Sequence, residues 1–180
     1  MGIYEGVLSR RAVFGRGFLM ITVTVGSQKF PFDRLIEKVD ALVQSGAIKD
    51  KVFAQIGAGT YRPKSFEYKD FVSSEELSQR LAQSDIVITH GGIGIIVTAL
   101  KCGKKVIAVP RLEKFGEHVD DHQIQIIKKY DKLNYIEPCY DIEDLEKSLE
   151  NIKTKKYADY NNYTSGAENI IQSIREFIGD

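Results

Sequence analysis

The 180-residue sequence lacks the features that mark several classes of protein. Basic and acidic residues both number 25, so the formal net charge is zero and the basic surplus typical of nucleic-acid-binding proteins is missing. Only two cysteines occur, Cys102 and Cys139; they are too few for a disulfide framework, and because neither has an obvious base beside it we expect both to be structural. No apolar run approaches the roughly 18 residues of a membrane-spanning helix. These absences favour a globular, cytoplasmic protein that binds no nucleic acid.

The first 19 residues have a composition of their own. They contain three arginines, Arg10, Arg11 and Arg16, against one acidic residue, Glu5, together with four glycines and no clean periodicity. An arginine-rich, acid-poor leader is compatible with a weak targeting or membrane-surface signal, but no uninterrupted apolar region and no small-residue cleavage site follow. We therefore expect residues 1–19 to be a flexible or start-site extension and residues 20–180 to be one folded domain.

From residue 20 onward, strand patterns alternate with helix patterns. Segments rich in β-branched and apolar residues predict strands at residues 21–25, 51–56, 66–72, 86–89, 105–109 and 133–137. Apolar residues at helical spacing predict helices at residues 32–46, from 73 or 74 onward, 94–100, 119–130, 141–150 and 168–178. This alternation favours an α/β fold, a Rossmann-like doubly wound parallel sheet of about six strands with helices on both faces.

Ligands of such sheets bind beyond the carboxyl ends of the strands, so we expect the binding site in the loops that follow the strands. One of these loops carries the sequence T-H-G-G-I-G, which begins at Thr89 and includes His90. Glycines let a backbone approach a ligand, and a helix starting near Gly94 would direct free N–H groups at an anion, which we expect to be a diphosphate. The same glycines are also compatible with a simple packing turn. No GxxxxGK[ST] phosphate loop occurs, and no GxGxxG follows the first strand, which disfavours a nicotinamide-dependent dehydrogenase.

A second polar cluster consists of Arg111 and residues 117–123 (EHVDDHQ). Its donors and acceptors suit sugar hydroxyls, and Arg111 suits phosphate charge. His118 and His122 are four residues apart on the predicted helix and could hold a metal with Asp121, but HExxH is absent and no further ligand is obvious, so we predict no metal. The alternative is a solvated helix start whose acidic residues favour the helix dipole.

Three tyrosines, Tyr157, Tyr160 and Tyr163, are spaced by three residues. Such spacing is compatible with a contact surface for a partner, but aromatic spacing alone more often reflects core packing.

Several motifs together resemble a known family. Residues 85–123 (DIVITHGGIGIIVTALKCGKKVIAVPRLEKFGEHVDDHQ), with VTVGSQKFPFDRL at residues 23–35 and DFVSSEEL at residues 70–77, are similar to the donor-binding half of nucleotide-sugar glycosyltransferases of family 28. The small single-domain members look most alike, namely the catalytic subunit of the split UDP-GlcNAc transferase of dolichol-oligosaccharide synthesis and bacterial relatives in capsule and exopolysaccharide operons. The resemblance implies the C-terminal half of a GT-B fold, and residues 20–180 would be its nucleotide-sugar-binding domain.

The resemblance also implies roles for individual residues. Those facing the donor's phosphates would be Gly26, Ser27, His90, Gly91, Gly92 and Gly94. Those beside the uracil would be Phe71 and Val72, through their backbone groups. Those contacting the donor sugar or shaping its pocket would be Arg111, His118, Asp121, His122 and Gln123. Thr98 stands near the position of a family glutamate that holds the ribose hydroxyls, and a hydroxyl is a weaker partner than a carboxylate.

The function implied is that of a UDP-sugar-dependent glycosyltransferase subunit. It would transfer a hexose of the galactose, glucuronic acid or GlcNAc class to a lipid-linked acceptor in capsular or exopolysaccharide biosynthesis, without a metal or other cofactor. A membrane-anchored partner resembling the missing acceptor domain would hold it at the inner face of the membrane. His118 is the local candidate for the catalytic base, because imidazole titrates near neutral pH, although the partner could supply the base instead. The alternative is a non-catalytic enhancer of another transferase, for which Thr98 is the best support.

Overall fold

The computed structural model describes residues 18–162. The predicted leader therefore lies outside the described residues except for Phe18 and Leu19, as do Tyr163 and the predicted helix at residues 168–178. Leu19 is already part of the fold, since it packs against the core and its backbone N–H donates to Asp50. Among the described helices, none is long and apolar enough to cross a membrane.

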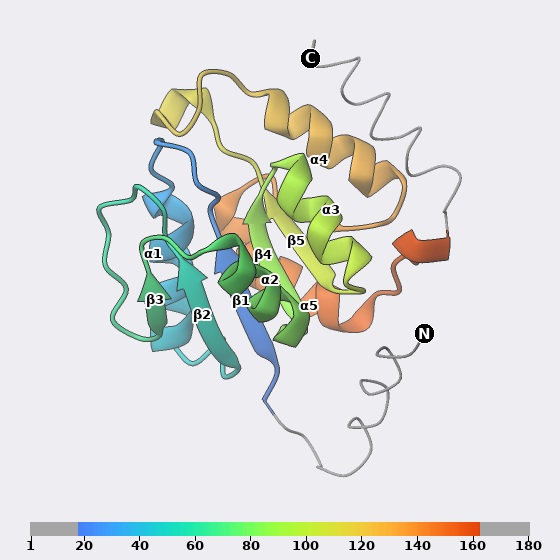
Figure 1. Ribbon diagram of the computed structural model, residues 1–180, viewed down its shortest axis with the longest axis horizontal. Coiled ribbons are helices and arrows are strands. Elements are labelled where there is room, and N and C mark those ends of the chain that lie inside the picture. Colours follow the sequence, from blue (N-terminus) through green and yellow to red (C-terminus); the bar gives the residue numbers. More distant parts are fainter. Residues whose placement is uncertain (1–17, 163–180) are drawn as a thin grey trace.

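The centre of the protein is a six-stranded parallel sheet with strand order β3-β2-β1-β4-β5-β6 (Figure 1). The strands are β1 (Met20–Thr24), β2 (Lys51–Gln55), β3 (Glu67–Lys69), β4 (Ile86–His90), β5 (Lys105–Val109) and β6 (Glu137–Pro138). This order is that of a doubly wound Rossmann-like sheet, so the predicted fold class is confirmed.

Helices cover both faces of the sheet (Figure 1). One face carries α1 (Asp33–Gln44) and α5 (Leu145–Thr154), and the other carries α2 (Ser74–Gln83), α3 (Ile93–Lys101) and α4 (His122–Lys132). Short 3-10 turns lie at η1 (Glu113–Phe115), η2 (Ile142–Asp144) and η3 (Tyr160–Asn162). Because side chains alternate along a strand, Ile86 and Ile88 of β4 pack on the α1 side while Val87 packs on the α3 side. Both faces of the central strands are therefore buried, as parallel sheets require.

Two of the predicted strands are shorter than expected, and the chain geometry explains why. The strand predicted at residues 66–72 pairs only with β2, and the pairing ends at Gln55 opposite Lys69. The strand predicted at residues 133–137 is reduced to β6, since Asn134 has a positive φ of 55° and reverses the chain just after α4. The prediction was thus right that strands occur in these two segments and wrong about their bounds.

The two described tyrosines of the predicted series serve the packing. Tyr160 is buried, and its ring lies edge-on to that of Tyr135 with centroids 5.2 Å apart. Tyr157 is half-buried and its hydroxyl donates to the Glu137 carboxylate. The core-packing interpretation is confirmed for Tyr160.

Candidate functional site

The candidate site lies where the strand order changes direction, between the carboxyl ends of β1 and β4. The connections that follow β1, β3 and β4 enclose a pocket of about 400 Å³. Its lining residues come from these connections and from adjoining parts of β2, β4, α2 and α3: Gly26, Ser27, Gln28, Gln55, Val72, Ser74, Leu77, His90, Gly92, Gly94 and Ile95. The sequence T-H-G-G-I-G therefore forms one wall of a real cavity.

The imidazole of His90 lies between two glycines. Gly26 has a φ of 77°, and a Cβ there would lie 2.6 Å from His90 Nε2; a Cβ on Gly92 would lie 2.5 Å from His90 Cε1. Both positions must lack a side chain because the ring occupies that space. Burial, helped by the nearby charge of Arg111, lowers the pKa of His90 to about 4. The ring is therefore neutral at pH 7 and adds no charge to the pocket.

The amino terminus of α3 forms the floor of the pocket at Gly94 and Ile95. Its N-cap is Gly92, so no side chain caps the helix, and the first turn contains no acidic residue. The first N–H groups of a helix lack partners within the helix and carry its positive dipole end. This part of the pocket is therefore suited to an anion.

Arg111, which follows β5, is fully buried and joins the loop after β1 to the loop after β5. Its Nη1 donates to the backbone carbonyls of Phe30, Pro31 and Glu117 at 2.9 to 3.1 Å, and its Nη2 donates to that of Val25 at 2.5 Å. Burial lowers the pKa of Arg111 to about 10, which leaves the guanidinium charged at neutral pH. Of the two roles that the resemblance implied, shaping the pocket is the one that this geometry supports.

Gln123, in the first turn of α4, joins the loop after β4 to the loop after β5. Its Oε1 accepts from the backbone N–H of Gly91 at 3.0 Å and from that of Arg111 at 3.1 Å. A Cβ on Gly91 would lie 2.6 Å from the Cβ of Gln123, so the two residues touch directly. Gln123 thus fixes the loop after β4 to the loop after β5.

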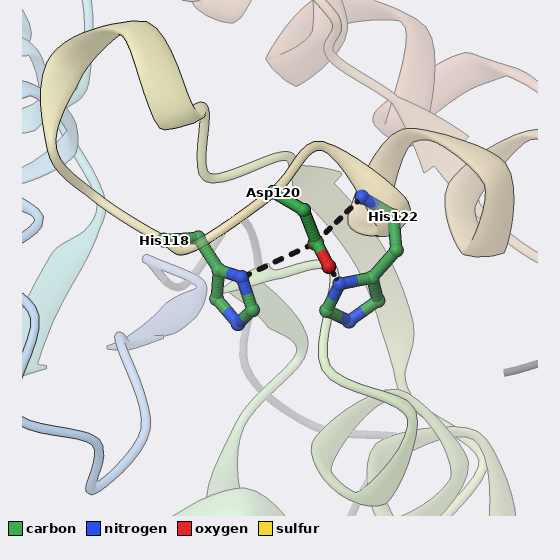
Figure 2. A group of neighbouring side chains, drawn as sticks. All are labelled: His118, Asp120 and His122. Carbon is green, nitrogen blue, oxygen red and sulfur yellow. Dashed lines mark hydrogen bonds and ion pairs between the residues drawn. The ribbon is translucent and has the colours of Figure 1, made fainter. Parts of the chain in front are cut away.

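His118 and His122 meet around one carboxylate, that of Asp120 (Figure 2). His118 Nδ1 lies 3.3 Å from Asp120 Oδ1, His122 Nδ1 contacts the same oxygen, and the ring centroids are 4.6 Å apart. Burial lowers the pKa of His118, and the neighbouring His122 adds to the effect. Asp121, the acid that the sequence paired with the histidines, instead accepts from the backbone N–H of Glu113 at 2.8 Å.

The helix predicted at residues 119–130 begins only at His122. The prediction that His118 and His122 lie on the same helix was therefore wrong. The side chain of Asp120 accepts from the His122 backbone N–H at 3.0 Å, a local bond that holds residues 120–122 in a turn. The rings therefore meet because the loop folds back, and not because they share a helix face.

Residues 20–177 match the family described as "Glycosyltransferase family 28 C-terminal domain". The chain belongs to this family.

Curated relatives of this family 28 chain include "UDP-N-acetylglucosamine transferase subunit ALG13" from two organisms. The Mus musculus protein is 31% identical over 127 residues, which are 65% of this chain and 10% of the relative. The Yarrowia lipolytica protein is 28% identical over 124 residues, which are 62% of this chain and 60% of the relative. The chain thus aligns with less than two thirds of either relative.

Solved structures share the fold at low sequence identity. The solution structure of ALG13 has a TM-score of 0.53 and 20% identity, covering 79% of this chain and 89% of that one. Acinetobacter baumannii MurG has a TM-score of 0.56 and 16% identity, covering 78% of this chain and 43% of that one. The fold of the family 28 domain is therefore that of a GT-B C-terminal half, as expected.

The pocket of the family 28 domain contains only part of the expected donor-site set. The expected residues that line it are Gly26, Ser27, Val72, His90, Gly92 and Gly94. Those that lie outside its lining are Phe71, Gly91, Thr98, Arg111, His118, Asp121, His122 and Gln123. Phe71 is about half exposed beside Val72, and Thr98 lies one turn into α3, where its hydroxyl donates to the Gly94 carbonyl at 2.7 Å.

Five lining residues had not been singled out as site residues: Gln28, Gln55, Ser74, Leu77 and Ile95. Gln55 is the most informative, because its Nε2 donates to the Gly26 carbonyl at 3.1 Å and so supports the loop after β1. The sequence could have pointed to Gln55, because it is an amide between apolar residues near the end of the strand segment KVFAQI.

Another pocket, of about 530 Å³, lies near the amino end of β5 and is lined in part by Lys104, Lys105, Lys155 and Lys156. Three of these ammonium groups are already bonded, to the carbonyls of Ala82 and Ile152 and to the Glu137 carboxylate. Since doubly wound sheets bind ligands at the carboxyl ends of their strands, the smaller pocket is the better candidate.

Proposed function

We propose that this chain is the donor-binding subunit of a UDP-sugar-dependent glycosyltransferase. The observation that carries the proposal is the pocket at the carboxyl ends of β1 and β4, which joins the uncapped amino terminus of α3 to the neutral ring of His90. The N–H groups of such a helix end suit a diphosphate, and they stabilise a UDP leaving group as its charge develops. Because this part of the site already supplies positive potential, the proposed transfer needs no metal ion.

The remaining parts of the donor would lie along the rim of the pocket. Backbone groups at Phe71 and Val72 would meet the uracil, and Ser27 would meet the phosphates; Val72 and Ser27 line the pocket. The segment with His118, Asp121 and His122 would face the sugar, while Arg111 and Gln123 hold the loops in position. We assign the base that activates the acceptor hydroxyl to His118, whose lowered pKa keeps its ring neutral and able to accept a proton at pH 7.

The transferred group and its acceptor are part of the same proposal. Two relatives are named as subunits of a UDP-N-acetylglucosamine transferase, which supports a hexose of the GlcNAc, galactose or glucuronic acid class. We propose a lipid-linked saccharide as the acceptor, in capsular or exopolysaccharide synthesis. A membrane-anchored subunit that resembles the N-terminal acceptor domain would bring the two substrates together at the cytoplasmic face of the membrane.

A second candidate function is that of a non-catalytic enhancer of another transferase. The observation in its favour is Thr98, whose hydroxyl is already bonded to the Gly94 carbonyl and which offers no carboxylate to ribose hydroxyls. An enhancer would need no donor affinity, so donor binding separates the two functions.

Titration calorimetry with UDP tests the proposal. We expect saturable binding to the purified chain and a loss of at least tenfold in affinity for Gly94→Asp, since the new carboxylate would meet the diphosphate at the helix terminus. A Cβ at Gly94 has no neighbour within 4 Å, so this variant keeps the fold.

The matched control is Ala47→Asp, which adds the same charge at an exposed position just before β2. Absence of heat at millimolar UDP, or equal binding by the two variants, would overturn the donor site and favour the enhancer.

A further inference from the structure

Three side chains with metal-binding atoms converge at the start of α4: His118, Asp120 and His122 (Figure 2). One ligand atom from each lies within 4.8 Å of the other two. The histidines approach through their Nδ1 atoms, and both face the same carboxylate oxygen.

We propose that His118, Asp120 and His122 bind one divalent transition-metal ion of the Zn²⁺ type. Two imidazole nitrogens and one carboxylate oxygen form a common three-ligand protein set for zinc, with the fourth position left to solvent. The proposal does not rest on the proposed function. An imidazole that binds a metal through Nδ1 carries its proton on Nε2, so the assignment of His118 as the base applies to the chain without the ion.

The spacing of His118 and Asp120 fits a tetrahedral ion. With metal–ligand bonds of about 2.0 to 2.1 Å, two ligands of a tetrahedron lie about 3.3 Å apart. His118 Nδ1 and Asp120 Oδ1 are separated by 3.3 Å. His122 and Asp120 contact more closely, so these two partly exposed side chains would have to move apart to bind the ion.

The burial of His118 supports a ligand at this point. Its side chain is only 8% exposed, and Nδ1 forms no hydrogen bond of acceptable geometry within the described part of the chain. A buried polar nitrogen without such a bond is energetically unfavourable, and coordination would satisfy it. On the open side, the Asp120 side chain is 55% exposed, so an ion has a route from solvent and room for a water ligand.

The composition of the whole chain makes the proposal easy to test. His90, His118 and His122 are the only histidines of the sequence, and His90 is enclosed by Gly26 and Gly92. Cys102 is an exposed thiol and the main competing soft ligand, so the experiments use a Cys102→Ser background.

The test is titration of the full chain with Co²⁺, followed by displacement with Zn²⁺. We expect one equivalent of Co²⁺ to give the intense visible absorption of a four-coordinate site, and Zn²⁺ to abolish it. Asp120→Asn and His122→Ala should each weaken Zn²⁺ binding at least tenfold in a competition with a chromophoric chelator. The matched control is Asp131→Asn, which removes an exposed carboxylate elsewhere on α4 and should leave binding unchanged.

Circular dichroism of each variant separates loss of the site from loss of the fold. Absence of the Co²⁺ bands in the folded parent chain would overturn the proposal. Equal Zn²⁺ affinity of Asp120→Asn, His122→Ala and Asp131→Asn would also overturn it, because the ion would then bind elsewhere.

Discussion

At the scale of single residues, the polar groups around the pocket fall into two kinds. Arg111, Gln123 and Gln55 use their polar atoms on backbone carbonyls and N–H groups of neighbouring loops. Ser27 and Gln28 line the pocket itself. The first kind holds the loops in place and the second is available to a ligand. Substitutions of the first kind should therefore lower stability, and substitutions of the second kind should lower ligand affinity.

His90 should make stability depend on pH. Its pKa is lowered from 6.5 to about 4 by burial, so between these values the unfolded chain binds a proton that the folded chain does not. Stability from this group is complete above pH 6.5 and is lost as the pH falls, by about 3 kcal/mol in total. Urea unfolding at pH 7.0, 5.5 and 4.5 should show that His90→Gln lacks this loss. Parallel pH curves for the two proteins would contradict the prediction.

Arg111 should contribute more to stability than an exposed arginine. Arg111→Lys keeps the charge but loses the fork of donors that reaches four carbonyls, and we expect it to lower the free energy of unfolding by about 2–4 kcal/mol. Arg62→Lys is the control, because Arg62 is about half exposed and pairs with Asp70 at 3.6 Å. The control should change stability by less than about 0.5 kcal/mol. Equal midpoints of urea unfolding for the two variants would show that the carbonyl contacts are unimportant.

At the scale of helices and strands, the sequence predicted the elements whose boundaries are set by residues that are neighbours in the chain. The β-branched run before Gly26 and the Ser73 cap, whose hydroxyl accepts from the Glu76 N–H, were visible in the sequence and occur in the structure. The start of α4 was not predictable from periodicity, since the Asp120 side chain competes with the helix for the His122 N–H.

In the site, too, features set by neighbouring residues were predictable and features set by residues far apart in the chain were not. The loop after β4 was identified because a glycine-rich turn between strand and helix is a local pattern. The role of Arg111 was not, because its partners Val25 and Phe30 lie more than 80 residues away in the chain. Spacing alone could place Arg111 at the carboxyl end of the sheet. It could not show that the guanidinium N–H groups donate to backbone carbonyls of the surrounding loops.

The element α3 offers a test of ribose recognition. Thr98 is exposed one turn beyond Gly94, which lines the pocket. Thr98→Glu would place a carboxylate near the position where the resemblance implies a glutamate, and we expect it to tighten UDP binding roughly tenfold through charge-assisted hydrogen bonds to ribose. Calorimetry with 2′-deoxy-UDP is the control, since a ligand without the 2′-hydroxyl should gain much less. An equal gain for both nucleotides would mean that the carboxylate does not contact ribose.

At the scale of the whole molecule, the sheet separates two regions that a ligand could occupy. The loops after β1, β3 and β4 gather at its carboxyl end, while the lysine-lined pocket lies near the amino end of β5. Strands β1 and β4, buried on both faces, connect the ends as a rigid unit. A ligand at one end should therefore leave the loops at the other end largely unchanged.

Hydrogen exchange with and without saturating UDP should locate the ligand. Binding stabilises the groups that it contacts, so we expect slower exchange at residues 26–28, 72–77 and 90–95. Residues 103–105 and 155–161, around the lysine-lined pocket, should exchange at the same rate in both samples. Gly94→Asp should abolish the protection at the carboxyl end, because it blocks the site without altering the sheet. Protection confined to residues 155–161 would instead place the nucleotide among the lysines, where phosphate charge alone could attract it, and would remove the structural basis for a donor site at α3.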